Sequence, residues 1–112
     1  MTTPVKFGLA EAMAALAKAP DDFITVATHG EARLLLFAPE GTDTQTPHTQ
    51  DEVYVVVSGS GTFRRGEEIV PFVAGDMLFV GAGVVHRFET FSDDFKTWVV
   101  FFGPKGGSVS GG

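Results

Sequence analysis

Short apolar runs separated by glycine-containing turns fill residues 21–103, and this pattern restricts the possible folds of the chain most strongly. The runs are rich in Val, Phe, Ile and Thr, which is the composition of β-strands. Many short strands at this spacing favour a β-sandwich or a barrel. We expect strands at residues 23–28, 33–38, 52–58, 61–65, 68–73, 76–80, 84–90 and 95–102.

Two of the turns are typical of β-hairpins. His29-Gly30 separates the first two predicted strands, and Ser58-Gly59-Ser60-Gly61 separates the third from the fourth. Glycine adopts the positive φ angles that tight turns require. We therefore expect the two strands of each pair to lie side by side.

The two ends of the chain differ from this central β-rich region, residues 21–103. In the N-terminal segment, residues 1–20, Leu9, Met13 and Leu16 recur at helical spacing in an Ala-rich stretch. We expect a short helix over residues 8–19 that packs its Leu/Met side onto a sheet. Residues 104–112 are rich in Gly and Ser, and we expect a flexible tail there.

Length and composition exclude several classes of protein. The 112 residues are the size of one domain, and the absence of cysteine excludes disulfides and thiolate metal sites. A net charge of −6 argues against nucleic-acid binding. No apolar stretch approaches the roughly 18 residues of a membrane span, and the N-terminus lacks the pattern of a signal peptide. We expect a cytoplasmic protein.

Several predicted strands are apolar on both faces. The clearest are residues 34–37, 53–57 and 98–102. A single helix cannot cover every outer face of the sheets that such strands form. A homodimer that pairs sheets is the expected arrangement.

Three residues stand out as candidates for a metal site. His48 and Glu52 flank the start of a predicted strand, where a period of two directs residues 48, 50, 52 and 54 to one face. His86 follows two glycine turns, at Gly75 and Gly83, that enclose another strand and that favour positive φ angles. We expect His86 to face the barrel interior opposite His48 and Glu52.

These spacings resemble the two sequence motifs of the cupins, over about residues 40–103. In the first motif His48, Glu52 and Gly59 match, and Thr46 stands where the family has its first histidine. In the second motif Gly75, Gly83 and His86 match, whereas Gly81 replaces a proline and Thr90 an asparagine. The resemblance implies an all-β fold, a double-stranded β-helix or jelly-roll barrel, with the short N-terminal α-helix outside it.

Two imidazoles and one carboxylate suit a divalent transition metal, namely Fe, Mn, Zn, Ni or Cu, and leave coordination positions open for water, substrate or O₂. Thr46 and Gln50 are weak ligands but have the position to orient His48 or a metal-bound water. Tyr54 and Phe88 have the right parity to line the same cavity, although aromatic residues in small barrels more often belong to the core. We interpret Arg64, Arg65 and Arg87 as solvated or directed away from the site.

Three functions are compatible with these features. The first is a metal-dependent enzyme, a dioxygenase-type oxidoreductase, that acts on a small organic substrate through His48, Glu52 and His86. The second is a non-catalytic cupin that binds or senses a small molecule. The third is a metal-free isomerase, for which no acid-base pair is identifiable. The sequence identifies neither the substrate nor a catalytic residue.

Overall fold

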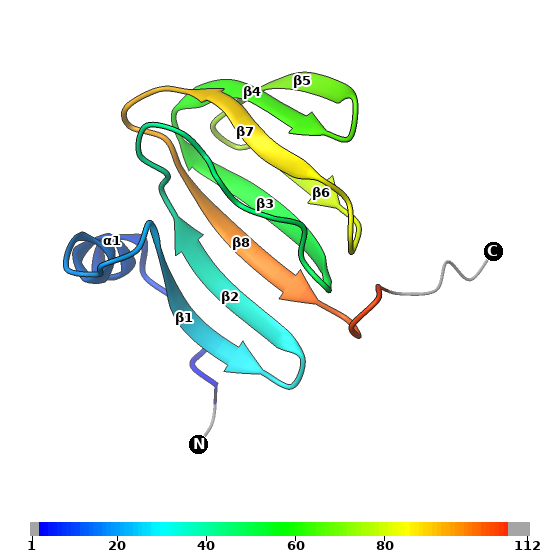
Figure 1. The fold of residues 1–112 in the computed structure, drawn as a ribbon. Helices are drawn as coiled ribbons and strands as arrows, with labels where there is room; N and C mark the ends of the chain where they lie inside the picture. Colours follow the sequence, from blue (N-terminus) through cyan, green and yellow to red (C-terminus); the bar gives the residue numbers. More distant parts are fainter. Residues whose placement is uncertain (1–2, 108–112) are drawn as a thin grey trace.

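The computed structural model describes residues 3–107, and this part of the chain contains one helix and eight strands (Figure 1). Each predicted strand is present, with ends that shift by at most two residues. The predicted tail at residues 104–112 falls partly outside the described residues; within them, the Gly106 N–H donates to the Thr49 carbonyl at 2.7 Å. The elements are α1 (Leu9–Ala17), β1 (Phe23–His29), β2 (Ala32–Phe37), β3 (Asp51–Ser58), β4 (Ser60–Arg65), β5 (Glu68–Val73), β6 (Met77–Val80), β7 (His86–Phe91) and β8 (Lys96–Phe102).

The strands form two antiparallel sheets that face each other (Figure 1). The larger sheet has the order β1-β2-β8-β3-β6, and the smaller has the order β5-β4-β7. After β3 the chain leaves the larger sheet, returns to it in β6, leaves again in β7 and returns in β8. This alternation between sheets is the connection of a jelly roll, so the predicted fold class is confirmed.

One predicted hairpin is correct and the other is wrong. β1 and β2 pair around Gly30 with His29 opposite Ala32. By contrast, β3 and β4 belong to different sheets, so Gly59 marks a crossing between sheets and not a hairpin. Gly59 has φ +85°, and a β-carbon there would lie 2.6 Å from the Cα of Phe95. The close approach of the two chain segments therefore requires glycine at the crossing.

The helix is less buried than its apolar stripe predicts. α1 contacts β1 and β2, but its buried residue is Ala12, and Leu9 and Met13 remain 36% and 38% exposed. The prediction that the Leu/Met side packs onto a sheet is therefore wrong for those two residues. The small side chain of Ala12 allows the closest approach of the helix to the sheet instead. No helix within residues 3–107 is long and apolar enough to cross a membrane.

The core between the sheets is built mainly from aromatic rings. Phe88 of β7 lies at its centre, with ring centroids of Phe95, Phe63, Tyr54 and Phe72 at 4.6, 4.8, 5.0 and 5.4 Å. Its neighbours come from both sheets and from the residue before β8. Edge-on and tilted pairs of this kind add to the stabilisation that burial alone provides.

Replacing Phe88 should therefore destabilise the domain more than replacing any exposed apolar residue. We expect Phe88→Ala to lower the free energy of unfolding by about 3–5 kcal/mol in urea denaturation, and Phe88→Leu to lower it by less. Ile69→Ala, at a position that is 51% exposed, should cost less than about 1 kcal/mol. Equal losses for Phe88→Ala and Ile69→Ala would contradict a core centred on this ring.

Candidate metal centre

In the first motif Glu52 follows the predicted strand alternation, whereas His48 does not. Glu52 and Tyr54 both lie on the inner face of β3, and both are buried. However, β3 begins only at Asp51, so His48 and Gln50 lie in the preceding loop and not on the strand. The expectation that a strand directs residues 48 and 50 to the Glu52 face is therefore wrong.

Backbone hydrogen bonds to other segments explain why this loop is not strand. The His48 carbonyl accepts from the Gly83 N–H at 2.7 Å, which joins the two motifs directly. Gly75 and Gly83 have φ angles of +95° and +78°, as the sequence predicts. The turn at Gly81–Gly83 thus places the backbone of His48 beside the start of β7, where His86 is the first residue.

The structure brings His48, Glu52 and His86 together at one end of the space between the sheets. Their candidate ligand atoms all lie within 4.8 Å of one another. Glu52 Oε1 is 2.7 Å from His86 Nε2 and 4.0 Å from His48 Nε2. Glu52 and His86 are almost completely buried, whereas His48 is partly exposed.

The short contact between His86 and Glu52 requires a positive charge beside the carboxylate. His86 Nδ1 lies 2.8 Å from the Val84 carbonyl, which can only accept, so this nitrogen carries the proton. The neutral ring then presents the Nε2 lone pair to a carboxylate oxygen. Within the described residues His86 Nε2 and both oxygens of Glu52 are buried without an aligned hydrogen-bond partner. A proton or a metal ion at this point removes the conflict.

The pKa values of the two histidines are shifted in opposite directions. Burial lowers the pKa of His48. The negative charge of Glu52 acts to raise this pKa, and the positive charge of Arg33 acts to lower it further. Burial also acts to lower the pKa of His86, but the contact with Glu52 outweighs it, and the pKa is raised. Burial and the charge of Glu52 raise the pKa of Tyr54 well above 10.0, so this phenol remains a hydrogen-bond donor.

Two residues that the sequence analysis did not single out hold the His48 loop in place. Gln45 Oε1 accepts from the Tyr54 hydroxyl at 3.0 Å and lies 3.3 Å from His48 Nε2. The Gln45 Nε2 donates to Asp43 Oδ2 at 2.6 Å, and the same oxygen accepts from the Phe88 N–H at 2.8 Å. The buried Asp43 carboxylate therefore ties the loop that carries His48 to the strand that carries His86.

Comparison with known proteins identifies the family. A sequence profile described as "Cupin domain" matches residues 33–102, which is more than half of the chain. The chain belongs to the cupin family. Its fold is similar to a Cupin 2 conserved barrel domain protein of Salinispora arenicola, with a TM-score of 0.67 and 15% identity, covering 92% of this chain and 91% of that chain. A cupin-2 domain protein of Shewanella frigidimarina gives a TM-score of 0.66 and 18% identity, covering 84% of this chain and 91% of that chain.

Two curated proteins share sequence with this cupin over shorter segments. An uncharacterized protein of Streptomyces coelicolor is 45% identical over 64 residues, which is 57% of this chain and 61% of that protein. An acireductone dioxygenase of Drosophila pseudoobscura pseudoobscura is 39% identical over 57 residues, which is 46% of this chain and 30% of that protein. The chain therefore spans less than two thirds of either relative.

The other residues predicted for the site of this cupin lie in different places. Thr46 is exposed, and Gln50 donates from its amide to the carbonyls of Glu31 and Gly103 at 2.7 and 2.8 Å. Gln50 is thus engaged at the end of β8 and does not reach the site. The Phe88 ring lies in the core and not on the cavity wall, whereas Tyr54 does line the cavity.

The site opens into a cavity of about 240 Å³, which is lined by strands of the larger sheet and by the loop that carries His48. Its walls are mostly apolar, and its polar groups gather around the three candidate ligands. Beside His48 and Glu52 the lining residues are Phe23, Arg33, Leu35, Phe37, Gln45, Tyr54, Val99 and Phe101. The arrangement is that of a small-molecule site with a few polar groups at its base.

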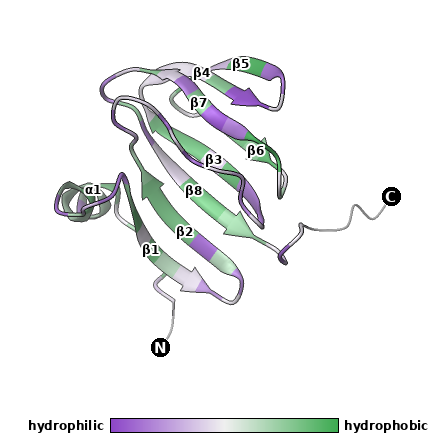
Figure 2. Ribbon diagram, in the orientation of Figure 1, coloured by the Kyte–Doolittle hydropathy of each residue, from purple (hydrophilic) through white to green (hydrophobic). Residues whose placement is uncertain are grey.

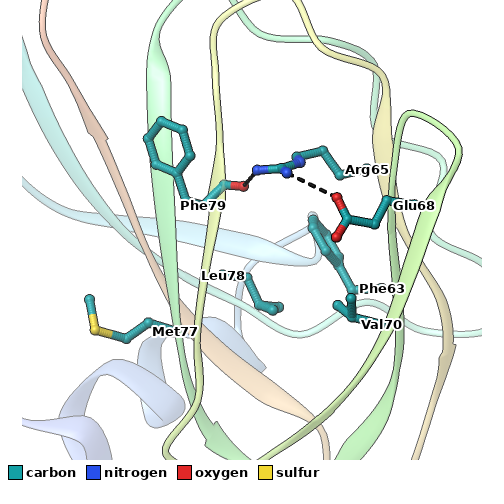
Figure 3. Close-up of a pocket in the computed structure, with 7 residues that line it drawn as sticks. All are labelled: Phe63, Arg65, Glu68, Val70, Met77, Leu78 and Phe79. Carbon is teal, nitrogen blue, oxygen red and sulfur yellow. Dashed lines mark hydrogen bonds and ion pairs between the residues drawn. The ribbon is translucent and has the colours of Figure 1, made fainter.

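A second cavity, of about 160 Å³, lies near the edge formed by β5 and β6 (Figure 3). Figure 3 shows Arg65 reaching from the Phe79 carbonyl to the Glu68 carboxylate, with distances of 3.2 and 3.0 Å. None of the three clustered ligands of the metal site lines this second cavity. Its one cation is paired, so we place the chemistry of the protein at the larger cavity.

Removing the Asp43 carboxylate should loosen the His48 loop. Asp43→Ala leaves the buried Phe88 N–H without its acceptor, and we expect the free energy of unfolding to fall by about 2–3 kcal/mol in urea denaturation. Asp93→Ala, at an exposed position, is the control and should change it by less than about 0.5 kcal/mol. A loss for Asp43→Ala no larger than that of the control would contradict the role of Asp43 as an anchor.

Proposed function

We propose that this cupin is a metal-dependent enzyme, a dioxygenase-type oxidoreductase, in which His48, Glu52 and His86 bind one divalent transition metal. The observation that carries this proposal is the cluster of three candidate ligand atoms within 4.8 Å of one another, in which the buried Glu52 Oε1 and His86 Nε2 lie 2.7 Å apart. Two neutral imidazoles and one carboxylate form a ligand set that suits Fe, Mn, Zn, Ni and Cu. The donor atoms present therefore fit such an ion.

A divalent ion held by these residues would supply Lewis-acid chemistry, and with iron, manganese or copper also one-electron redox chemistry. The residues of the chain do the rest. Val84 fixes the tautomer of His86, so that Nε2 is the free ligand atom. Gln45, which accepts from the Tyr54 hydroxyl, lies 3.3 Å from His48 Nε2, and this nitrogen would exchange Gln45 for the ion on metal binding. The apolar walls keep water away from the bound substrate.

The shared segment with an acireductone dioxygenase supports the choice of reaction class. It covers 30% of that relative, so the substrate and the reaction remain part of this proposal. A non-catalytic cupin that binds a small molecule would use the same cavity and the same residues. The two functions differ in whether the bound molecule is converted, which O₂ consumption measures.

Metal analysis of purified protein tests the site. After growth with added metals, we expect about one transition-metal ion per chain in the wild type and in His29→Ala. His29 is a matched control, because it is exposed and its ring contacts Thr3 at 2.8 Å, away from the site. His48→Ala, Glu52→Gln and His86→Ala should each bind metal at least about tenfold more weakly in titrations of the stripped protein.

A wild type that contains no metal, and that takes up none of Fe(II), Mn(II), Zn(II), Ni(II) and Cu(II) on reconstitution, would refute the proposed centre. With metal bound, O₂ consumption is then measured against catechols, thiols, diketones and small carboxylates. Consumption that needs all three ligands supports the dioxygenase. Tight binding of one of these compounds without O₂ consumption would indicate the binding protein instead.

A further inference from the structure

Arg33 places a positive charge at the mouth of the metal-site cavity. It shares the inner face of β2 with Leu35 and Phe37, and its guanidinium carbon lies 4.6 Å from the centre of the Phe101 ring. The same Phe101 ring packs edge-on against His48 at 4.8 Å. Arg33 therefore lies one aromatic ring away from a candidate metal ligand, and its charge is close enough to lower the pKa of His48.

The charge of Arg33 has no counterion in the part of the chain that is described. Its guanidinium packs on the Phe101 ring, and no carboxylate within residues 3–107 lies within ion-pair distance of it. The arginines on the smaller sheet differ: Arg64 and Arg87 contact Glu89, and Arg65 contacts Glu68. In a chain with a net charge of −6, an unpaired arginine at a cavity mouth is available for an anion from outside.

The rest of the cavity limits what this anion is. Leu35, Phe37, Val99 and Phe101 give apolar walls, which suit an apolar body and disfavour a sugar or another polyol. The cavity volume is about 240 Å³, so the molecule is small. A planar guanidinium at the mouth matches a carboxylate, which it can bind through two parallel hydrogen bonds.

We propose that the substrate or ligand of this site is a small monocarboxylate with an apolar body, and that Arg33 binds its carboxylate. This inference rests on the proposed function for the metal, but the role of Arg33 as an anion-binding residue is measurable with or without a bound ion. Arg33 determines specificity by charge, while the cavity walls select for size.

Pairs of acid and neutral amide of equal size test the role of Arg33. We measure binding of benzoate and benzamide, and of hexanoate and hexanamide, by titration calorimetry with metal-loaded and metal-free protein. We expect each acid to bind the wild type about tenfold or more tightly than its amide. Arg33→Met keeps the length of the side chain and should remove this preference, Arg33→Lys should keep part of it, and Arg65→Met should keep all of it.

The controls separate this inference from the metal proposal. Metal content is measured for every variant, and Arg33→Met should retain the ion of the wild type. Equal affinities for acids and amides in the wild type, or an acid preference that Arg33→Met leaves unchanged, would overturn the role of Arg33. If the wild type binds no metal but still prefers the acids through Arg33, the metal proposal fails and this one stands.

A second inference comes from the outer face of the larger sheet. Cross-strand neighbours there form two rows that end at β6 and point away from the core. Figure 2 shows β2, β8, β3 and β6 to be hydrophobic along most of their length. The first row is Leu34, Val100, Val53 and Phe79, and the second is Trp98, Val55 and Met77. Leu36, which is paired with Trp98, is completely buried within the single chain and takes no part in this face.

These two rows contain no charged or polar side chain. Met77 and Phe79 at the β6 end are 68% and 50% exposed, which is unusual for residues of their size in the folded state. An antiparallel sheet with one free face normally alternates apolar and polar residues, so the composition indicates a covered face. Edge-to-edge addition at β6 is disfavoured, because Arg65 already occupies the Phe79 carbonyl.

We propose that a second copy of this chain covers the apolar rows and forms a face-to-face dimer with two-fold symmetry. The neutral face explains how two chains, each with a net charge of −6, can associate without bringing like charges together. The two rows pair with the same rows of the partner, as a two-fold axis requires. The charged side chains then remain at the rim and on the smaller sheets.

Light scattering on size-exclusion fractions tests this dimer. We expect the wild type to have twice the 11.9 kDa mass of the chain, and Met77→Lys and Phe79→Lys to have the mass of one chain. Ile69→Lys, an equally exposed apolar position on β5, should remain a dimer. A wild type that is monomeric at about 100 μM, well above typical dimer dissociation constants, or a Phe79→Lys variant that stays dimeric, would overturn the proposal.

Discussion

The contact between Glu52 and His86 is the constraint on which the rest of the site depends. A carboxylate that is 1% exposed and lacks an aligned donor is costly unless a positive charge lies beside it. The protein has placed it against an imidazole whose proton is directed to the Val84 carbonyl. Folding thus requires a positive charge at this point, which either a proton on His86 or the proposed metal ion would provide.

The jelly-roll connection is what brings these two residues together. Glu52 belongs to the larger sheet and His86 to the smaller one, and the chain between them makes one excursion through β4 and β5 and one return through β6. The turn at Gly81–Gly83 then bonds to the backbone of His48. Packing around Phe88 fixes the distance between the sheets, so the aromatic core and the site are parts of one arrangement.

The local patterns in the sequence predicted the strands and the inward positions of Glu52 and His86, because alternation and glycine turns are short-range signals. His48 reaches the same site from a loop, which alternation did not predict. The local patterns failed where contacts between distant segments of the chain determine the structure. Gly59 resembles a hairpin turn, but its approach to Phe95 makes it a crossing between sheets. Asp43 gave no local signal, since its partner at Phe88 is 45 residues away. Arg33 could have been found, because it alternates in step with Leu35 and Phe37.

The origin of the ligands in two different sheets has a mechanical consequence. An ion bound to Glu52 and His86 would join the larger sheet to the smaller one at the edge of the aromatic core. Widening of the cavity mouth would then lengthen the bonds between the ion and its ligands. Entry of a large ligand would pull Glu52 and His86 apart, so the chain should reject large ligands more strongly with an ion bound there than without one.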